Sequence, residues 1–154
     1  MSVVILRPAA PADSEFCFQL HKAAMGEYVA ATWGWDEAVQ RAYHEEAFDP
    51  GRWQIVTVDG ADAGVMIVEH GADEVYLSRI ELHPGYQGQG IGAQLIRTLL
   101  DAARRRGQAV ALDVLAVNTR ALAFYQRHGF HEVVRRGESN RKVRMRFTCQ
   151  QVNE

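Results

Sequence analysis

A glycine-rich segment constrains the fold of this chain more than any other feature of its sequence. It reads Gln87-Gly88-Gln89-Gly90-Ile91-Gly92, follows the apolar run Val75–Leu82, and opens an apolar-periodic stretch at Ile91. A strand that passes through glycines into a helix presents unpaired backbone N–H groups at the positive end of the helix dipole. Such an end can bind phosphate or pyrophosphate, because glycine lets ligand oxygens approach the main chain and allows positive φ. The segment therefore predicts a strand–loop–helix unit that holds a phosphate-bearing ligand.

Length and composition predict a single soluble domain over residues 1–154. Of the 154 residues, 47% are hydrophobic and 23% are charged, which is the balance of a typical globular protein. The formal net charge of −2 provides no basic surface for nucleic acid. Met1–Arg7 lacks the apolar core of a signal peptide, and no uncharged run is long enough to span a membrane. We therefore expect a cytoplasmic protein that binds neither nucleic acid nor membrane.

The spacing of cysteine and histidine predicts no metal site. Cys17 and Cys149 lie far apart and match no metal or redox motif, so we interpret them as structural or free thiols. His21, His44 and His83 show no paired spacing of the kind found in zinc sites.

Apolar periodicity predicts strands that alternate with helices. The expected strands are Val3–Leu6, Trp53–Val58, Ala63–Glu69, Val75–Leu82, Ala109–Leu115, Phe130–Val134 and Lys142–Phe147. The expected helices run across Phe16, Leu20 and Ala24, over Asp36–Phe48, from Ile91 to the stop at Gly107, and from Asn118 to His128-Gly129. This order indicates one layered domain of the α/β or α+β class.

A second polar pair follows the glycine segment. Asn118 and Tyr125 are seven positions apart on one predicted helix, so their side chains project from the same face. Taken separately, Asn118 could be a plain N-cap and Tyr125 a half-buried core aromatic. Taken together, they suit a site in which Asn118 contacts the tail of a ligand and Tyr125 donates a proton. An ordinary tyrosine can do so because its pKa of about 10 keeps it protonated at neutral pH.

The glycines also match a loose dinucleotide-binding fingerprint. Gly88-x-Gly90-x-x-Ala93 has the required spacing, and Asp113 follows about twenty residues later. However, the glycines come after four predicted strands, and too little chain remains behind them for a doubly wound sheet. A dinucleotide-dependent oxidoreductase therefore remains only an alternative.

Three linked segments resemble the GNAT superfamily of N-acetyltransferases. Residues 87–92 fit its Q/R-x-x-G-x-G/A pyrophosphate loop, and Ile80-Glu81-Leu82-His83-Pro84 looks like the strand that precedes this loop. The residues from Asn118 to Phe130 look like the second motif of the family. The resemblance is specific over Val75–Val134.

The resemblance implies an α/β (α+β) fold and an acetyl-CoA site. The fold would contain a mixed, mostly antiparallel twisted sheet of about six to seven strands with about four helices, in which two parallel strands splay apart at the acyl-CoA site. The backbone of Ile80 and Leu82 would pair with pantetheine, and Asn118 would contact the pantetheine or acetyl region. Tyr125 would protonate the departing coenzyme A. The pyrophosphate would be held by the N–H groups of Gln87, Gly88, Gln89, Gly90, Ile91 and Gly92.

The same resemblance implies direct attack by an amine, which must be neutral. For a lysine-like amine with a pKa of about 10.4, deprotonation at pH 7 costs roughly 4–5 kcal/mol, so a base would help. Asp113 sits where some members carry a glutamate base, Glu81 neighbours the pantetheine strand, and Glu74 stands near the base of histone-type members. Each could equally be a solvated or ion-paired carboxylate.

The acceptor is expected to bind after the first helix, where the resemblance places the acceptor pocket. The candidate residues there are Glu27, Tyr28, Trp33, Trp35 and Asp36. Aromatic rings and carboxylates suit a cationic amine, although Trp33 and Trp35 could simply pack the helix turn. Polyamine, aminoglycoside, amino acid, peptide N-terminus and protein lysine all remain open as acceptors.

The sequence thus predicts an acetyl-CoA-dependent N-acetyltransferase that acts on a primary amine, and the resemblance favours a homodimer. The main alternative from another class is a non-catalytic domain that binds or senses acyl-CoA through the same loop.

Overall fold

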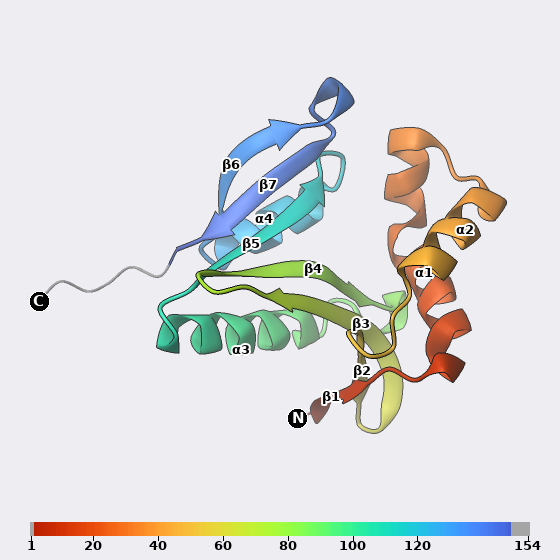
Figure 1. The fold of residues 1–154 in the computed structure, drawn as a ribbon, viewed down its shortest axis with the longest axis horizontal. Helices are drawn as coiled ribbons and strands as arrows, with labels where there is room; N and C mark the ends of the chain where they lie inside the picture. The colour runs from red at the N-terminus through yellow and green to blue at the C-terminus, as the bar shows by residue number, and fades with distance from the viewer. Residues whose placement is uncertain (1, 149–154) are drawn as a thin grey trace, which may run out of the picture. The chain divides into compact units, whose positions relative to one another are not determined.

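The computed structural model describes residues 2–148 and has a strand or helix at every predicted place, although the first helix is longer than expected. Within this range the strands are β1 (Val4–Pro8), β2 (Gln54–Val58), β3 (Ala61–His70), β4 (Glu74–Leu82), β5 (Ala109–Leu115), β6 (His131–Arg136) and β7 (Lys142–Phe147). The α-helices are α1 (Ser14–Trp33), α2 (Glu37–Ala47), α3 (Ile91–Arg105) and α4 (Thr119–Arg127), as labelled in Figure 1. Among them, no helix has the length and apolar character needed to cross a membrane.

The strands form a mixed sheet with the order β1-β2-β3-β4-β5-β7-β6. The pairs β1–β2, β2–β3, β5–β7 and β6–β7 are antiparallel. β4 and β5 are parallel, with a register that runs from Glu74 opposite Ala109 to Tyr76 opposite Ala111. The expected mixed, mostly antiparallel sheet with one parallel pair is therefore confirmed.

Local turn chemistry explains the β2–β3 hairpin. Its two turn residues, Asp59 and Gly60, both have positive φ, at 50° and 86°. A two-residue hairpin turn requires this geometry because its twist matches that of the flanking strands, and Asp-Gly supplies it at low cost.

The contacts divide the chain into two compact units, and both units include parts of β3 and β4. The first unit comprises the chain up to Val68 together with Arg79–Gly92, and the second comprises Glu69–Ser78 together with the chain from Ala93 onward. The first unit therefore contains α1, α2, the C-terminal part of β4 and the glycine-rich loop. The second contains β5, β6, β7 and α4.

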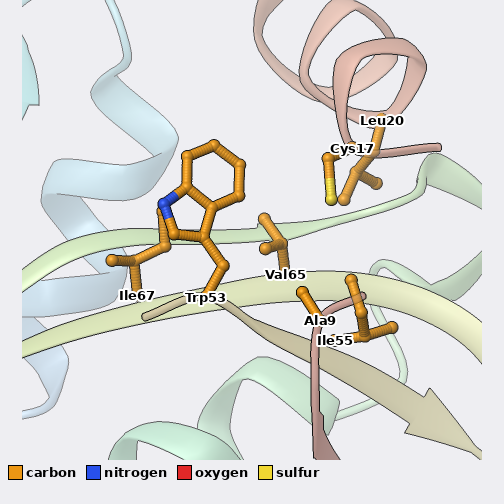
Figure 2. Close-up of a cluster of buried hydrophobic side chains, with 7 residues drawn as sticks. All are labelled: Ala9, Cys17, Leu20, Trp53, Ile55, Val65 and Ile67. Carbon is orange, nitrogen blue, oxygen red and sulfur yellow. The ribbon is translucent and has the colours of Figure 1, made fainter. Parts of the chain in front are cut away.

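A cluster of buried side chains forms a core within the first unit (Figure 2). Phe16 and Phe48 pack against it. Cys17 is fully buried there as a free thiol, which agrees with its interpretation from sequence, whereas Cys149 lies outside the described residues. The members of the cluster are Ala9, Cys17, Leu20, Trp53, Ile55, Val65 and Ile67.

One expectation about the acceptor residues is wrong. Glu27, Tyr28 and Trp33 do not follow the first helix but lie on it, because α1 continues to Trp33. Gly26 does not interrupt the helix, and it costs only about 1 kcal/mol relative to alanine. The helix ends instead at Gly34, whose φ of 83° suits a residue without a side chain and whose N–H donates to the Ala30 carbonyl at 3.0 Å.

Candidate active site

The glycine-rich loop joins β4 to α3 in a conformation that demands glycine. After a short 3-10 turn at Pro84–Tyr86, Gly88 and Gly90 adopt φ values of 75° and 80°. A Cβ at either position would meet nothing within 4 Å. The requirement for glycine is therefore conformational rather than a matter of packing, and space is left around the loop backbone.

Two glutamine side chains hold this loop. The Gln87 side-chain amide donates to the Leu82 carbonyl at 2.9 Å, and the Gln89 amide donates to the Gly85 carbonyl at 2.9 Å. The backbone N–H of Gln87, which we expected to face the pyrophosphate, donates to the Pro84 carbonyl at 3.2 Å. Gln87 thus shapes the loop through both its side chain and its main chain.

The backbone N–H groups that follow Gln87 are the ones available to a ligand. Among the described residues, the loop and turn hydrogen bonds include none donated by the N–H of Gly88, Gln89 or Gly90. Ile91 and Gly92 form the first turn of α3, where N–H groups have no partner within the helix. This row of donors at the positive end of a 15-residue helix is a suitable site for a phosphate group.

β4 carries an acidic residue on its buried face. Side chains alternate along a strand, so Val75, Leu77 and Glu81 share one face, and all three are buried. Glu81 is only 6% exposed although it is a carboxylate at a position with an apolar pattern. Ile80 and Leu82, on the opposite face, are partly buried.

Glu81 pairs with His21, a residue of α1 that sequence reasoning considered only as a metal ligand. Nδ1 of His21 lies 2.7 Å from Oε2 of Glu81. Nε of Arg79 lies 3.8 Å from Oε1, yet this buried oxygen accepts no hydrogen bond. A weak signal for His21 exists in the sequence, because it lies on the same helical face as the buried Cys17 and Leu20.

Two tryptophans of the first unit lie near His21 and Arg79. The ring of Trp35 lies 6.4 Å from that of His21, and its Nε1 donates to Oε2 of Glu37 at 2.9 Å. The guanidinium of Arg79 lies over Trp53, at 4.9 Å from the ring centroid.

The other acceptor candidates occupy more exposed positions. Glu27 and Trp33 are exposed on α1, Trp33 with 53% of its surface accessible, and Tyr28 is partly buried. Asp36 caps α2 by accepting a hydrogen bond from the N–H of Val39 at 3.0 Å. Trp35 is therefore the acceptor candidate that the structure places beside His21.

The two candidate carboxylates of the second unit, Asp113 and Glu74, are both paired with arginines. Asp113 accepts hydrogen bonds from the Tyr76 hydroxyl at 2.6 Å, from Arg144 at 2.9 and 3.0 Å, and from Arg136 at 3.2 Å. Burial alone would raise the pKa of Asp113, but the hydrogen bonds from Arg144, Tyr76 and Arg136 lower it to about 2. Glu74 forms an ion pair with Arg146 at 3.0 Å.

Asn118 and Tyr125 occupy the two ends of α4. Asn118 is 9% exposed, and its Oδ1 accepts from the N–H of Ala121 at 3.1 Å, so its expected role as an N-cap is confirmed. The ring of Tyr125 is partly buried, 5.3 Å from that of Phe124 and 5.5 Å from that of Phe130.

Comparison with known proteins identifies the family. The family model for the acetyltransferase (GNAT) family matches residues 16–130, which is most of the chain and includes parts of both units. The chain belongs to the GNAT family. The resemblance read from the loop and from the segment Asn118–Phe130 is thereby confirmed.

Curated relatives and solved structures agree with this membership. The ribosomal protein bS18-alanine N-acetyltransferase of Escherichia coli is 38% identical over 78 residues, which cover 50% of this chain and 53% of that protein. An N-alpha-acetyltransferase of Mycobacterium tuberculosis is 47% identical over 60 residues, or 39% of this chain and 37% of its own. The chain thus spans about half the length, or less, of these relatives.

The fold matches that of solved GNAT structures. The PaiA N-acetyltransferase of Thermoplasma acidophilum, crystallised in complex with coenzyme A, superposes with a TM-score of 0.74 over 95% of this chain and 99% of its own. Its sequence identity is 17%, so the match concerns the fold alone.

Proposed function

We propose that this GNAT protein transfers the acetyl group of acetyl-CoA directly to a primary amine. The observation that carries the proposal is the loop between β4 and α3, where Gly88 and Gly90 have positive φ and the N–H groups of Gly88, Gln89 and Gly90 have no partner among the described residues. A pyrophosphate is the part of acetyl-CoA that such donors would bind. A GNAT structure in complex with coenzyme A supports this choice of ligand.

In this proposal the donor is held mainly by main-chain groups. The backbone of Ile80 and Leu82 would pair with the pantetheine arm, and Asn118 would contact the pantetheine or acetyl region. The pyrophosphate would lie against the N–H groups of Gly88, Gln89, Gly90, Ile91 and Gly92, while Gln87 shapes the loop and adds its own N–H only if the bond to Pro84 opens.

Tyr125 would act as the general acid for the departing thiolate. An ordinary tyrosine keeps its proton at neutral pH and can donate it to the sulfur as the bond between carbon and sulfur breaks. No nucleophile from the enzyme is required, because the amine attacks the thioester carbonyl itself.

Of the three carboxylates considered as bases, Glu81 has the most favourable surroundings. A general base needs a lone pair that reaches the amine and a conjugate acid that is not too strong. The low pKa of Asp113, about 2, makes it a weak base, and both of its oxygens already accept hydrogen bonds from arginines. Glu74 is paired with Arg146. Glu81 retains one oxygen without a hydrogen bond.

The acceptor that we propose is the N-terminal amine of a peptide or protein. Two relatives of this chain are a ribosomal protein-alanine N-acetyltransferase and an N-alpha-acetyltransferase. Candidate contacts for the acceptor are Glu27, Tyr28, Trp33 and Trp35, of which Trp35 lies beside His21. A cytoplasmic location remains a prediction from the sequence, and a homodimer remains a prediction from the family resemblance.

Calorimetric titration with acetyl-CoA and with NAD tests the donor half of the proposal. We expect saturable binding of acetyl-CoA and none of NAD. Binding of NAD alone would favour the dinucleotide alternative, and binding of neither would contradict the assignment of the loop.

Turnover with two peptides tests the acceptor half and excludes a non-catalytic binding domain. We expect acetylation of a peptide with a free N-terminal alanine, and none of the same peptide with a blocked N-terminus and an internal lysine. Tyr125→Phe should lower kcat by about 10²-fold or more, the range of general acid catalysis, without changing the Kd for acetyl-CoA. Tyr43→Phe is a matched control, because Tyr43 is 61% exposed on α2. An unchanged kcat in Tyr125→Phe would remove Tyr125 from its role.

A further inference from the structure

We propose that His21 is the group that takes the proton from the acceptor amine. In this proposal Glu81 positions the imidazole and stabilises the imidazolium, rather than acting as the base itself. This inference rests on the proposed acetyl transfer and assigns within it a residue that sequence reasoning considered only as a metal ligand. The observation behind it is the 2.7 Å contact between Nδ1 of His21 and Oε2 of Glu81.

The contact determines which nitrogen of His21 carries the proton. An ionised carboxylate can only accept hydrogen bonds, so Nδ1 must be the donor to Glu81. In the neutral imidazole this leaves Nε2 with a lone pair, which is the form required of a proton acceptor. Among the described residues, none forms a hydrogen bond with Nε2 of His21.

Exposure favours His21 over Glu81 as the group that meets the amine. The side chain of His21 is 21% exposed, whereas that of Glu81 is 5% exposed. An amine that arrives from solvent can therefore reach Nε2 without entering the core, while Glu81 lies behind the imidazole.

The surrounding charges suit a carboxylate that supports an imidazolium. Oε1 of Glu81 is buried without a hydrogen bond, and Nε of Arg79 is 3.8 Å away, so this carboxylate is not saturated. Burying an oxygen without a hydrogen bond costs free energy, so such atoms are rare outside functional sites. In the second unit Asp113, held by two arginines and a tyrosine, illustrates the saturated arrangement expected of a purely structural carboxylate.

The location of the pair agrees with this role. Glu81 lies on β4 between Ile80 and Leu82, the residues proposed to pair with the pantetheine arm. α1, this part of β4 and the loop up to Gly92 all belong to the first unit. Trp35, whose ring lies 6.4 Å from that of His21, provides an aromatic face beside the incoming amine.

The proton balance of the step is simple. Nε2 of His21 takes one proton from the ammonium group, and Glu81 stabilises the imidazolium that results. The amine nitrogen then forms its bond to the acetyl carbon while the bond from that carbon to sulfur breaks. As the amide forms, Tyr125 gives its proton to the sulfur, and the second proton lost by the nitrogen passes through solvent to restore Tyr125. His21 returns its own proton to solvent. One proton is released overall.

Variants of His21 test the proposal in the chain of 154 residues with the alanine-terminated peptide. His21→Asn keeps an N–H that can donate to Glu81 but has no basic nitrogen. We expect its kcat to fall by about 10²-fold or more, with the Kd for acetyl-CoA and the Tm close to those of the wild type. His131→Asn, which removes an exposed histidine of β6, is the matched control and should keep wild-type activity.

Chemical rescue separates a basic role from a structural one. Added imidazole should restore part of the kcat of His21→Ala and leave the wild type unchanged. Glu81→Gln should also lower kcat, because an amide can turn its N–H toward Nδ1 and leave the proton on Nε2. If His21→Asn retained the wild-type kcat, or if added imidazole restored none of the kcat of His21→Ala, His21 would not be the base. A wild-type protein that transfers no acetyl group would instead contradict the proposed function itself.

Discussion

At the scale of single residues, two carboxylates of this protein illustrate how surroundings separate structural from chemical roles. Asp113 and Glu81 both lie on strands of the same sheet. Asp113 accepts hydrogen bonds from Tyr76, Arg136 and Arg144, whereas one oxygen of Glu81 accepts none. The first arrangement stabilises an ion-paired carboxylate, and the second is the arrangement that we propose supports a proton transfer.

The hydrogen bonds of Asp113 make a prediction about stability. We expect Asp113→Asn to lower the free energy of unfolding by about 1–3 kcal/mol at pH 7, because two arginines lose a partly buried counter-charge. Urea unfolding measures this change. Asp101→Asn is the control, since Asp101 is 61% exposed and its contact with Arg104 is 3.8 Å long. Equal effects of the two substitutions would contradict the structural role of Asp113.

The same residue predicts acid sensitivity. The pKa of Asp113 in the folded protein, about 2, lies below its ordinary value of 3.8. The unfolded chain therefore binds a proton more readily between these values, so stability falls as the pH falls through this window. The contribution is fully present above pH 3.8 and is lost near pH 2. The free energies of unfolding of the wild type and of Asp113→Asn should therefore converge as the pH falls from about 5 to about 2.

At the scale of elements, the loop between β4 and α3 shows how backbone conformation can create a binding site. Gly90 has a φ of 80°, and a Cβ there would contact nothing within 4 Å. A substitution should therefore strain the loop rather than disturb the core. We expect Gly90→Val to weaken acetyl-CoA binding by roughly tenfold to a hundredfold, because a β-branched residue at positive φ costs about 1–3 kcal/mol.

The control for this prediction is Gly26→Ala. Gly26 lies inside α1 without positive φ, and a Cβ there would only approach Cγ of Lys22 at 3.9 Å. This substitution should raise stability by about 0.5–1 kcal/mol and leave acetyl-CoA binding unchanged. Calorimetric Kd values for the two variants decide the matter, and normal binding by Gly90→Val would show that the loop has been misassigned.

At the start of α4, the capping role of Asn118 can be tested separately from its proposed contact with acetyl-CoA. Asn118→Ala should cost about 0.5–2 kcal/mol of stability, because the N–H of Ala121 loses its acceptor. Asn118→Asp preserves a capping oxygen and places a negative charge at the helix N-terminus, where it is favourable. Thermal unfolding should therefore match the wild type for the aspartate variant. If Asn118 also donates to pantetheine, this variant should bind acetyl-CoA more weakly, and unchanged binding would reduce Asn118 to a cap.

At the scale of the whole molecule, a ligand that binds only the folded chain must stabilise it. At about 100 times the Kd, acetyl-CoA should add about 2.7 kcal/mol to the free energy of unfolding. For a chain of this length, this corresponds to a rise in Tm of about 5–10 °C. Differential scanning fluorimetry would detect it, with NAD at equal concentration as the control. A rise with NAD but not with acetyl-CoA would contradict the proposed donor.

By itself the sequence determined the secondary structure, the loop and the family. These features rest on local patterns such as the alternation in Val75–Leu82, the glycines at positions 88 and 90, and the cap at Asn118. It placed the end of α1 too early, because an internal glycine such as Gly26 is tolerated within a long helix.

Only the tertiary structure decided which charged groups meet. Asp113 faces Arg144 because the antiparallel register of β5 and β7 places these residues opposite each other. His21 meets Glu81 across 60 positions of sequence because α1 packs against the end of β4. Such pairs depend on strand order and helix packing, which arise from contacts between distant segments. Local periodicity in the sequence does not predict these contacts. The family resemblance implied that a base would help, and the fold brings together the histidine and the carboxylate that we propose for this role.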